Sequence, residues 1–125
     1  MQTILMSLAA VASLITFSVH TFIGGPRVAA PLLADTHLPP AAKWLSYYCW
    51  HLATIFLLAM SLGFAYVALN PDRPELAVFL SATSAALSVL SAVVAIKGGI
   101  NPFRFPSTSL FAIVSALGTA ALLVQ

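Results

Sequence analysis

The chain has 125 residues, of which 61% are hydrophobic and only 6% are charged, and its mean hydropathy is +1.03. A soluble domain carries about 25% charged residues, so this composition excludes a soluble globular protein and indicates an integral membrane protein. The net charge of +2, from five Lys or Arg and three Asp or Glu, excludes a nucleic-acid-binding surface. The single cysteine, Cys49, excludes an intrachain disulfide and a cysteine cluster for zinc.

Four apolar segments are long enough to cross the hydrocarbon core, which takes about 20 helical residues. The N-terminal segment lacks the basic region of a secretory signal, so we expect a retained first span. Lone strands cannot span lipid, because their backbone groups stay unpaired. The sequence therefore predicts one all-α domain over residues 1–125, an integral membrane four-helix bundle. Its helices are expected at about 3–23, 40–69, 75–96 and 107–125.

Glycine and proline are expected to end these helices. The sequence 24-GGP-26 should end the first, and the segment of about 24–39 should then lie along the membrane surface. Within it, 27-RVAAPLLADTH-37 could form a short interfacial helix with Val28, Leu32 and Leu33 toward lipid. The ends FIGGPR and IKGGINPFR of the first and third helices resemble each other, as a duplicated hairpin with a pseudo-two-fold axis would require. Helices that simply stop at Gly and Pro beside a basic residue explain the likeness more simply.

Lysine and arginine residues near the helix ends predict the orientation. Arg27 and Lys43 flank the first connection, Lys97 and Arg104 flank the third, and Arg73 alone lies in the second. The first and third connections are therefore expected in the cytoplasm, with both termini on the other side. The four basic residues of that side are candidates for binding anionic lipid headgroups.

Two histidines are the candidate site residues inside the bundle. His20 continues the small and polar positions of the first helix, which include Thr16, and His51 follows Tyr47 by four residues in the second. Both imidazoles should lie about one turn inside the same boundary, so we predict that they face each other. An ionisable group within a membrane bundle is by default a site candidate, although hydrogen bonding to Tyr47 or to a serine is an equally ordinary role.

Several ligands fit such a pair of histidines. They could bind a haem axially, coordinate a copper ion, or hydrogen-bond a quinone carbonyl beside Tyr47. No Asp or Glu lies inside the four spans, because Asp35, Asp72 and Glu75 are all in connections or at helix ends. This argues against a proton-driven exporter like those of the small multidrug-resistance family. No set of nucleophile, base and acid is visible either, so the sequence favours a protein that is not an enzyme.

Three function classes follow from these observations. The first is a non-catalytic accessory or assembly subunit, whose partners would be the lipid bilayer and other membrane subunits or further copies of this chain. The second is a binder of haem, copper, quinone or another small ligand through His20 and His51. The third, a small transporter, is the weakest because the spans carry so little charge.

The motifs 20-HTFIGG-25, 48-YCWHLATIFLLA-59 and 98-GG-99 stand in an order that resembles a known family. Its members are small four-helix inner-membrane proteins of unknown function, widespread in bacteria and with animal relatives. The resemblance implies the same fold and topology and a place in the bacterial inner membrane. It implies no activity.

Overall fold

The computed structural model describes residues 1–124, which are helical except for short connections. Helix α1 (Gln2–Ser18), the π-helix η1 (Val19–Ala29) and helix α2 (Ala30–Ala34) follow one another without a break. They are followed by α3 (Pro40–Leu69), α4 (Pro74–Lys97), the 3-10 helix η2 (Pro102–Arg104) and α5 (Pro106–Leu123). Four helical stretches are long and apolar enough to cross a membrane. The predicted all-α membrane four-helix bundle is confirmed.

The expected end of the first helix at 24-GGP-26 is wrong. The helical stretch runs from Gln2 to Ala34, and Pro26 lies inside η1. Proline has no N–H to donate and its ring collides with the carbonyl four residues earlier. The wider π-helical turn, in which the N–H of Ala30 bonds to the carbonyl of Gly25 five residues back, accommodates the ring without ending the helix.

The surface loop expected at 24–39 is accordingly much shorter, because residues 24–34 are helical. Only residues 35–39 connect the first stretch to α3. There the Asp35 carboxylate accepts hydrogen bonds from the backbone N–H groups of His37 at 2.6 Å and Leu38 at 3.0 Å. These bonds form a tight turn that sends α3 back along η1 and α1.

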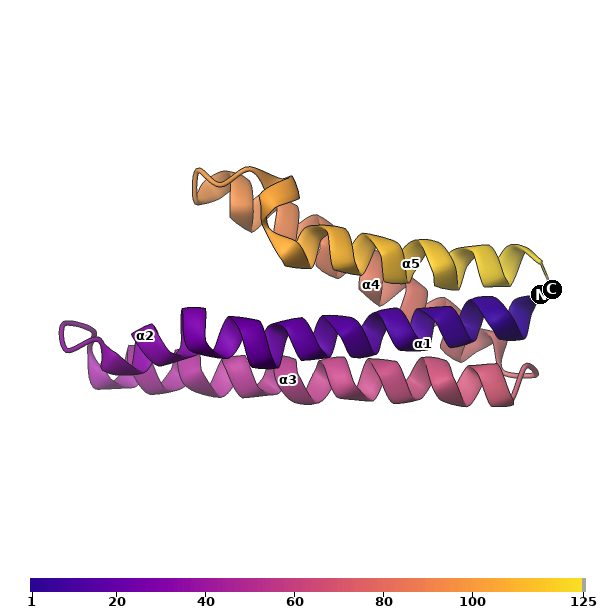
Figure 1. Cartoon of the computed structure of the whole chain (residues 1–125), viewed down its shortest axis with the longest axis horizontal. Helices are drawn as coiled ribbons and strands as arrows, with labels where there is room; N and C mark the ends of the chain where they lie inside the picture. Colours follow the sequence, from indigo (N-terminus) through magenta and orange to yellow (C-terminus); the bar gives the residue numbers. More distant parts are fainter. Residues whose placement is uncertain (125) are drawn as a thin grey trace.

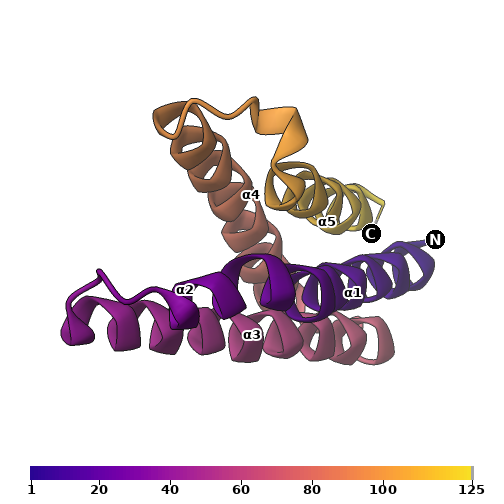
Figure 2. The same ribbon diagram turned by 60° about the vertical axis from the view of Figure 1, so that its left-hand side comes forward.

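The bundle consists of two hairpins that meet at one end and splay at the other. In the first hairpin (residues 2–69) α1 lies along α3, and in the second (residues 74–123) α4 lies along α5 (Figure 1). Helix α1 also packs against α5 near the two chain ends, whereas α3 and α4 share few contacts. Figure 2 shows α4 running away from α3 at a wide angle, so that the hairpins separate toward η2. We call the end with the two chain termini and the α3–α4 turn (residues 70–73) the closed end. The end with residues 35–39 and η2 is the open end.

Large side chains and one glycine hold the closed end together. Phe64 is fully buried. A Cβ added to Gly118 would lie 3.0 Å from Cε1 of Phe64 and would also collide with the side chain of Ser81. Small residues allow such close approach of membrane helices, where burial brings no hydrophobic gain. Across α1 and α3, the Ser61 hydroxyl donates to the carbonyl of Ala10 at 3.0 Å. Side-chain packing and hydroxyl bonds therefore both join the helices here.

A group of hydroxyls joins α4 to α5 near the open end. Ser88 Oγ donates to the carbonyl of Thr108 at 2.8 Å, and Ser91 Oγ lies 2.7 Å from Ser107 Oγ and 2.9 Å from Thr108 Oγ1. Each of these side chains thereby satisfies its polar atom within the hairpin. Helices α4 and α5 therefore remain packed together at the open end, where the second hairpin lies apart from the first.

Candidate functional site

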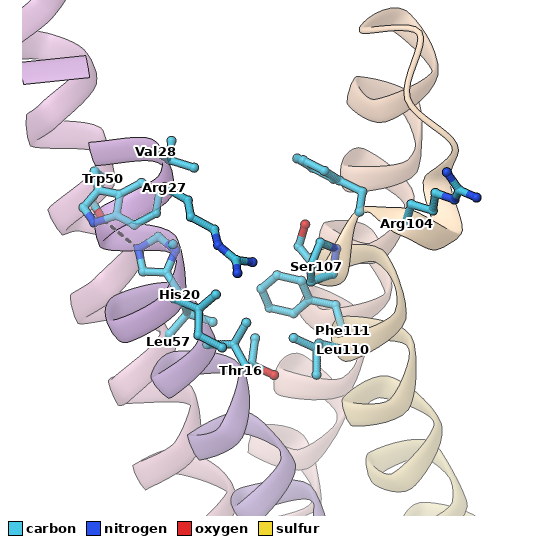
Figure 3. Close-up of a pocket in the computed structure, with 15 residues that line it drawn as sticks. Thr16, His20, Arg27, Val28, Trp50, Leu57, Arg104, Ser107, Leu110 and Phe111 are labelled. Atoms are coloured by element: carbon cyan, nitrogen blue, oxygen red, sulfur yellow. Dashed lines mark hydrogen bonds between the residues drawn. The ribbon is translucent and has the colours of Figure 1, made fainter. Parts of the chain in front are cut away.

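A cleft of about 450 Å³ occupies the space between the splayed hairpins. One wall is formed by η1 with the end of α1 and part of α3, and the other by η2 and the start of α5 (Figure 3). Most of the lining is apolar, with a few polar groups from both walls. The apolar residues include Val19, Ile23, Val28, Leu57, Phe105, Leu110 and Phe111, and the polar ones are Thr16, His20, Arg27, Arg104 and Ser107.

Arg27 gives the cleft its charge. Figure 3 shows its guanidinium group projecting from η1 into the space between the hairpins, whereas the side chain of Arg104 points away from the cleft at its rim. The three carboxylates of the chain, Asp35, Asp72 and Glu75, are not among the lining residues. The cleft thus carries positive charge with no acidic residue to neutralise it, and it suits an anion.

The depth of Arg27 follows from helix geometry. At 1.5 Å per residue, about 20 residues cross the roughly 30 Å hydrocarbon core. Counted from Gln2 at the closed end, that distance ends near Phe22, and Arg27 lies about one turn beyond it. Counted in this way, the backbone of Arg27 lies just beyond the span, and its side chain points back toward the level of the His20 ring near the edge of the span (Figure 3).

His20 is fixed to α3 by its Nε2 atom. This nitrogen lies 3.2 Å from the carbonyl oxygen of Trp50 and 3.2 Å from Thr54 Oγ1. The imidazole also stacks on the Trp50 indole, with ring centroids 3.9 Å apart and planes 18° from parallel. A carbonyl oxygen can only accept, so Nε2 carries the proton and donates it, and Nδ1 of the neutral ring is left as an acceptor.

Gly24 allows Trp50 to take this position. A Cβ added at Gly24 would lie 2.7 Å from Cη2 of the indole, closer than real Cβ contacts come. The indole is thus held between the backbone of η1 and the ring of His20. The π-helix matters here because such stretches are rare and are frequently found at functional sites.

The predicted pairing of His20 with His51 is wrong. The face of α3 that meets His20 carries Trp50 and Thr54, and residue 51 lies about 100° further around the helix. His51 is exposed, and its ring contacts that of Tyr47 edge-on at a centroid distance of 4.5 Å. Tyr47 is therefore a neighbour of His51 and does not line the cleft with His20.

The remaining candidates divide between the cleft and its surroundings. Thr16 is buried at the inner end of the cleft, where its hydroxyl donates to the carbonyl of Ala12 at 2.8 Å. Lys43 and Lys97 do not line the cleft. Sequence reasoning thus found four of the lining residues, Thr16, His20, Arg27 and Arg104. It missed Trp50, which also lines the cleft.

The geometry does not provide the cofactor sites weighed from the sequence. Across residues 1–124, no three or more His, Cys, Asp and Glu side chains are grouped so that they could hold a metal ion. Because the His20 ring is bonded to Trp50 and Thr54 and the His51 ring contacts Tyr47, the two rings are not arranged as an axial pair for haem or as a shared copper site. A quinone carbonyl needs a donor, and the His20 N–H already donates to Trp50.

No family model, curated protein or solved structure matches this chain. The resemblance to the small four-helix membrane family therefore stays a prediction from its short motifs. The function has to be inferred from the cleft itself.

Proposed function

We propose that this membrane protein binds an anionic amphiphile between its two hairpins and that it is not an enzyme. The anionic head binds Arg27, and the apolar chain lies between the walls below it. The observation that supports this most directly is the guanidinium of Arg27, which projects into an apolar cleft without a lining carboxylate.

The lining residues fit both parts of such a ligand, the anionic head and the apolar chain. The guanidinium presents a planar set of donors that matches the oxygens of a phosphate or carboxylate, and such charge-assisted bonds are the strong ones. Deeper in the cleft, Val19, Leu57, Leu110 and Phe111 offer only apolar surface. The volume of about 450 Å³ lies in the lower part of the 300–1,000 Å³ range typical of small-molecule sites.

The polar groups of the cleft support binding in preference to catalysis. The Thr16 hydroxyl donates to its own helix, and the Ser107 hydroxyl bonds to Ser91. His20 does not contact either hydroxyl as a base would contact a nucleophile, because its bonds go to Trp50 and Thr54. These hydrogen bonds hold the helices that form the cleft walls, and the side chains do not form a catalytic arrangement of nucleophile and base.

The open end is proposed to face the cytoplasm. Both termini lie at the closed end (Figure 1), and Arg27, Lys43, Lys97 and Arg104 all belong to connections or helix ends of the open end. An excess of Lys and Arg marks the cytoplasmic side. The ligand would then enter from the cytoplasmic leaflet. A role as an accessory subunit stays an alternative proposal, compatible with ligand binding but not favoured by any feature of the cleft.

Fluorescence of Trp50 can test the proposal. Trp44→Phe leaves Trp50 as the sole tryptophan, and a long-chain alkyl phosphate brominated near its head should quench it on contact. In phosphatidylcholine nanodiscs we expect saturable quenching that Arg27→Gln weakens roughly tenfold to hundredfold, as expected for loss of a charge-assisted hydrogen bond.

Two matched variants serve as controls for this measurement. Arg73→Gln removes an equal charge from the α3–α4 turn at the closed end and should leave the affinity unchanged. Arg104→Gln, at the rim, should have a smaller effect than Arg27→Gln. Quenching that does not saturate, or that is equal in the Arg27 and Arg73 variants, would show that the phosphate is held by the bilayer and not by the cleft.

A further inference from the structure

The cleft contains an imidazole nitrogen that makes no hydrogen bond within the described residues. Both side-chain hydrogen bonds of His20 are made by Nε2, so Nδ1 has no partner within residues 1–124. As derived above, Nδ1 of the neutral ring is an acceptor. Figure 3 shows the ring between Trp50 on one side and the cleft on the other. An acceptor left unpaired after a ligand has displaced water costs binding free energy, so a well-matched ligand would bring a donor.

The hydroxyl side chains nearby do not supply that donor. The Thr16 hydroxyl donates to the carbonyl of Ala12, and Thr54 donates to the carbonyl of Trp50 at 3.0 Å. Ser107 stands on the opposite wall and bonds to Ser91. Arg27 makes no hydrogen bond to His20 within residues 1–124, and its donors are directed to the anion in the proposed complex. We therefore expect the partner of Nδ1 to come from the ligand.

The position of Arg27 limits where on the ligand that donor lies. Arg27 follows His20 by seven residues on the same wall, and Figure 3 shows its side chain directed back toward the level of the His20 ring. The group bound by the guanidinium and the group bound by the imidazole must then be neighbours in the ligand. A hydroxyl one or two carbons from the anionic head meets this condition.

We infer that the cleft selects a single-chain anionic lipid with a hydroxyl group beside its head. This inference rests on the proposed function and specifies its ligand class. The anion binds Arg27, the hydroxyl donates to Nδ1 of His20, and the one acyl chain lies along Leu57 and Phe111. Lysophosphatidic acid and 3-hydroxy fatty acids share this chemistry.

The test compares ligands that differ only in the hydroxyl. Binding of 1-oleoyl lysophosphatidic acid and of its 2-deoxy analogue is measured by competition with the brominated alkyl phosphate in the same nanodiscs. We expect the hydroxyl to tighten binding about tenfold, the upper range for one neutral hydrogen bond. The pair 3-hydroxytetradecanoate and tetradecanoate repeats the comparison with a carboxylate head, and the pair with the larger preference identifies the source of the ligand.

Variants of His20 show whether the preference arises at Nδ1. His20→Leu should abolish the preference for the hydroxyl, while His20→Gln should retain part of it, because an amide can donate to Trp50 and accept from the ligand. His51→Leu, at the exposed histidine, should leave it unchanged. Different partitioning of the ligands into the bilayer would affect all variants equally.

The outcomes separate this inference from the proposed function. If both members of each pair bind the wild-type protein equally, or if the preference persists in His20→Leu, the hydroxyl is not recognised and the inference is wrong, while anion binding at Arg27 stands. If no ligand binds at all, the proposed function fails first. The wild-type comparison decides the matter even if His20→Leu does not fold.

Discussion

The two Gly-Gly pairs of the chain have the same sequence and opposite structural effects. Gly24-Gly25 lies inside η1, and the helix continues through it for nine further residues to Ala34. Gly98-Gly99 ends α4, with Gly99 in the left-handed region at φ 69°. Both pairs stand near the open end of the bundle, and both are followed within three residues by a proline.

Their surroundings account for the difference. After Gly25 come Pro26 and a run of helix-compatible residues, and Trp50 of the neighbouring helix packs against Gly24. After Gly99 come Ile100 and Asn101, whose side chain accepts a hydrogen bond from the N–H of Phe103 at 2.9 Å and starts η2. A glycine pair permits a helix to end, and the residues that follow it and pack on it decide whether it does.

The largest effect is expected at Gly24. In Gly24→Ala the new methyl group would lie 2.7 Å from Trp50 Cη2, and the indole cannot withdraw without losing its stacking on His20. We expect a loss of about 1–3 kcal/mol in the free energy of unfolding, as for overpacking in other cores. Reversible unfolding in mixed micelles measures it, and the emission of Trp50 in the Trp44→Phe background should shift at the same time.

A smaller effect is expected at Gly99. Gly99→Ala places a side chain in the left-handed region, which costs about 1–2 kcal/mol although no atom lies within 4 Å of the added Cβ. Gly98→Ala is the matched control, because Gly98 has φ −81° and ordinary contacts of 3.4 Å or more. Equal unfolding free energies for the two variants would mean that backbone conformation does not decide the end of α4.

The smallest effect, of opposite sign, is expected at Gly25. An added Cβ meets nothing within 4 Å there and φ is not positive, so Gly25→Ala should stabilise the helix by about 0.5–1 kcal/mol. Alkyl phosphate binding should be unaltered. A destabilised Gly25→Ala protein would indicate that the π-helical turn needs glycine for its backbone, beyond the space that Trp50 needs.

The same comparison shows how far sequence reasoning reaches. The four spans could be predicted because about 20 consecutive apolar residues have few other uses. The end of α4 followed from Gly-Gly in the same way. The continuation through Gly24 could not, because it depends on Trp50, which is 26 residues away in the chain and packs on that glycine.

The inward face of α3 was harder to predict for a related reason. In a helix surrounded by lipid both faces are apolar, so the hydrophobic pattern does not distinguish inside from outside. Polar residues were the remaining guide, and Tyr47 and His51 suggested a face centred about 60° away from the one that carries Trp50 and Thr54. His20 and Thr16 were placed correctly, because on α1 small residues mark the packed side.

The hydrogen bonds among Ser88, Ser91, Ser107 and Thr108 affect how the two hairpins can move relative to each other. It fastens α4 to α5 at the open end, so the second hairpin should move as a rigid body. Among the described residues, its tight contacts with the first hairpin include those of Gly118 with Phe64 and of Leu80 with Gly63, toward the closed end. Rotation about that point widens or narrows the cleft without breaking a helix. Such hinge motions occur in microseconds to milliseconds, and they, not local fraying, are expected to set the rate at which a ligand enters and leaves.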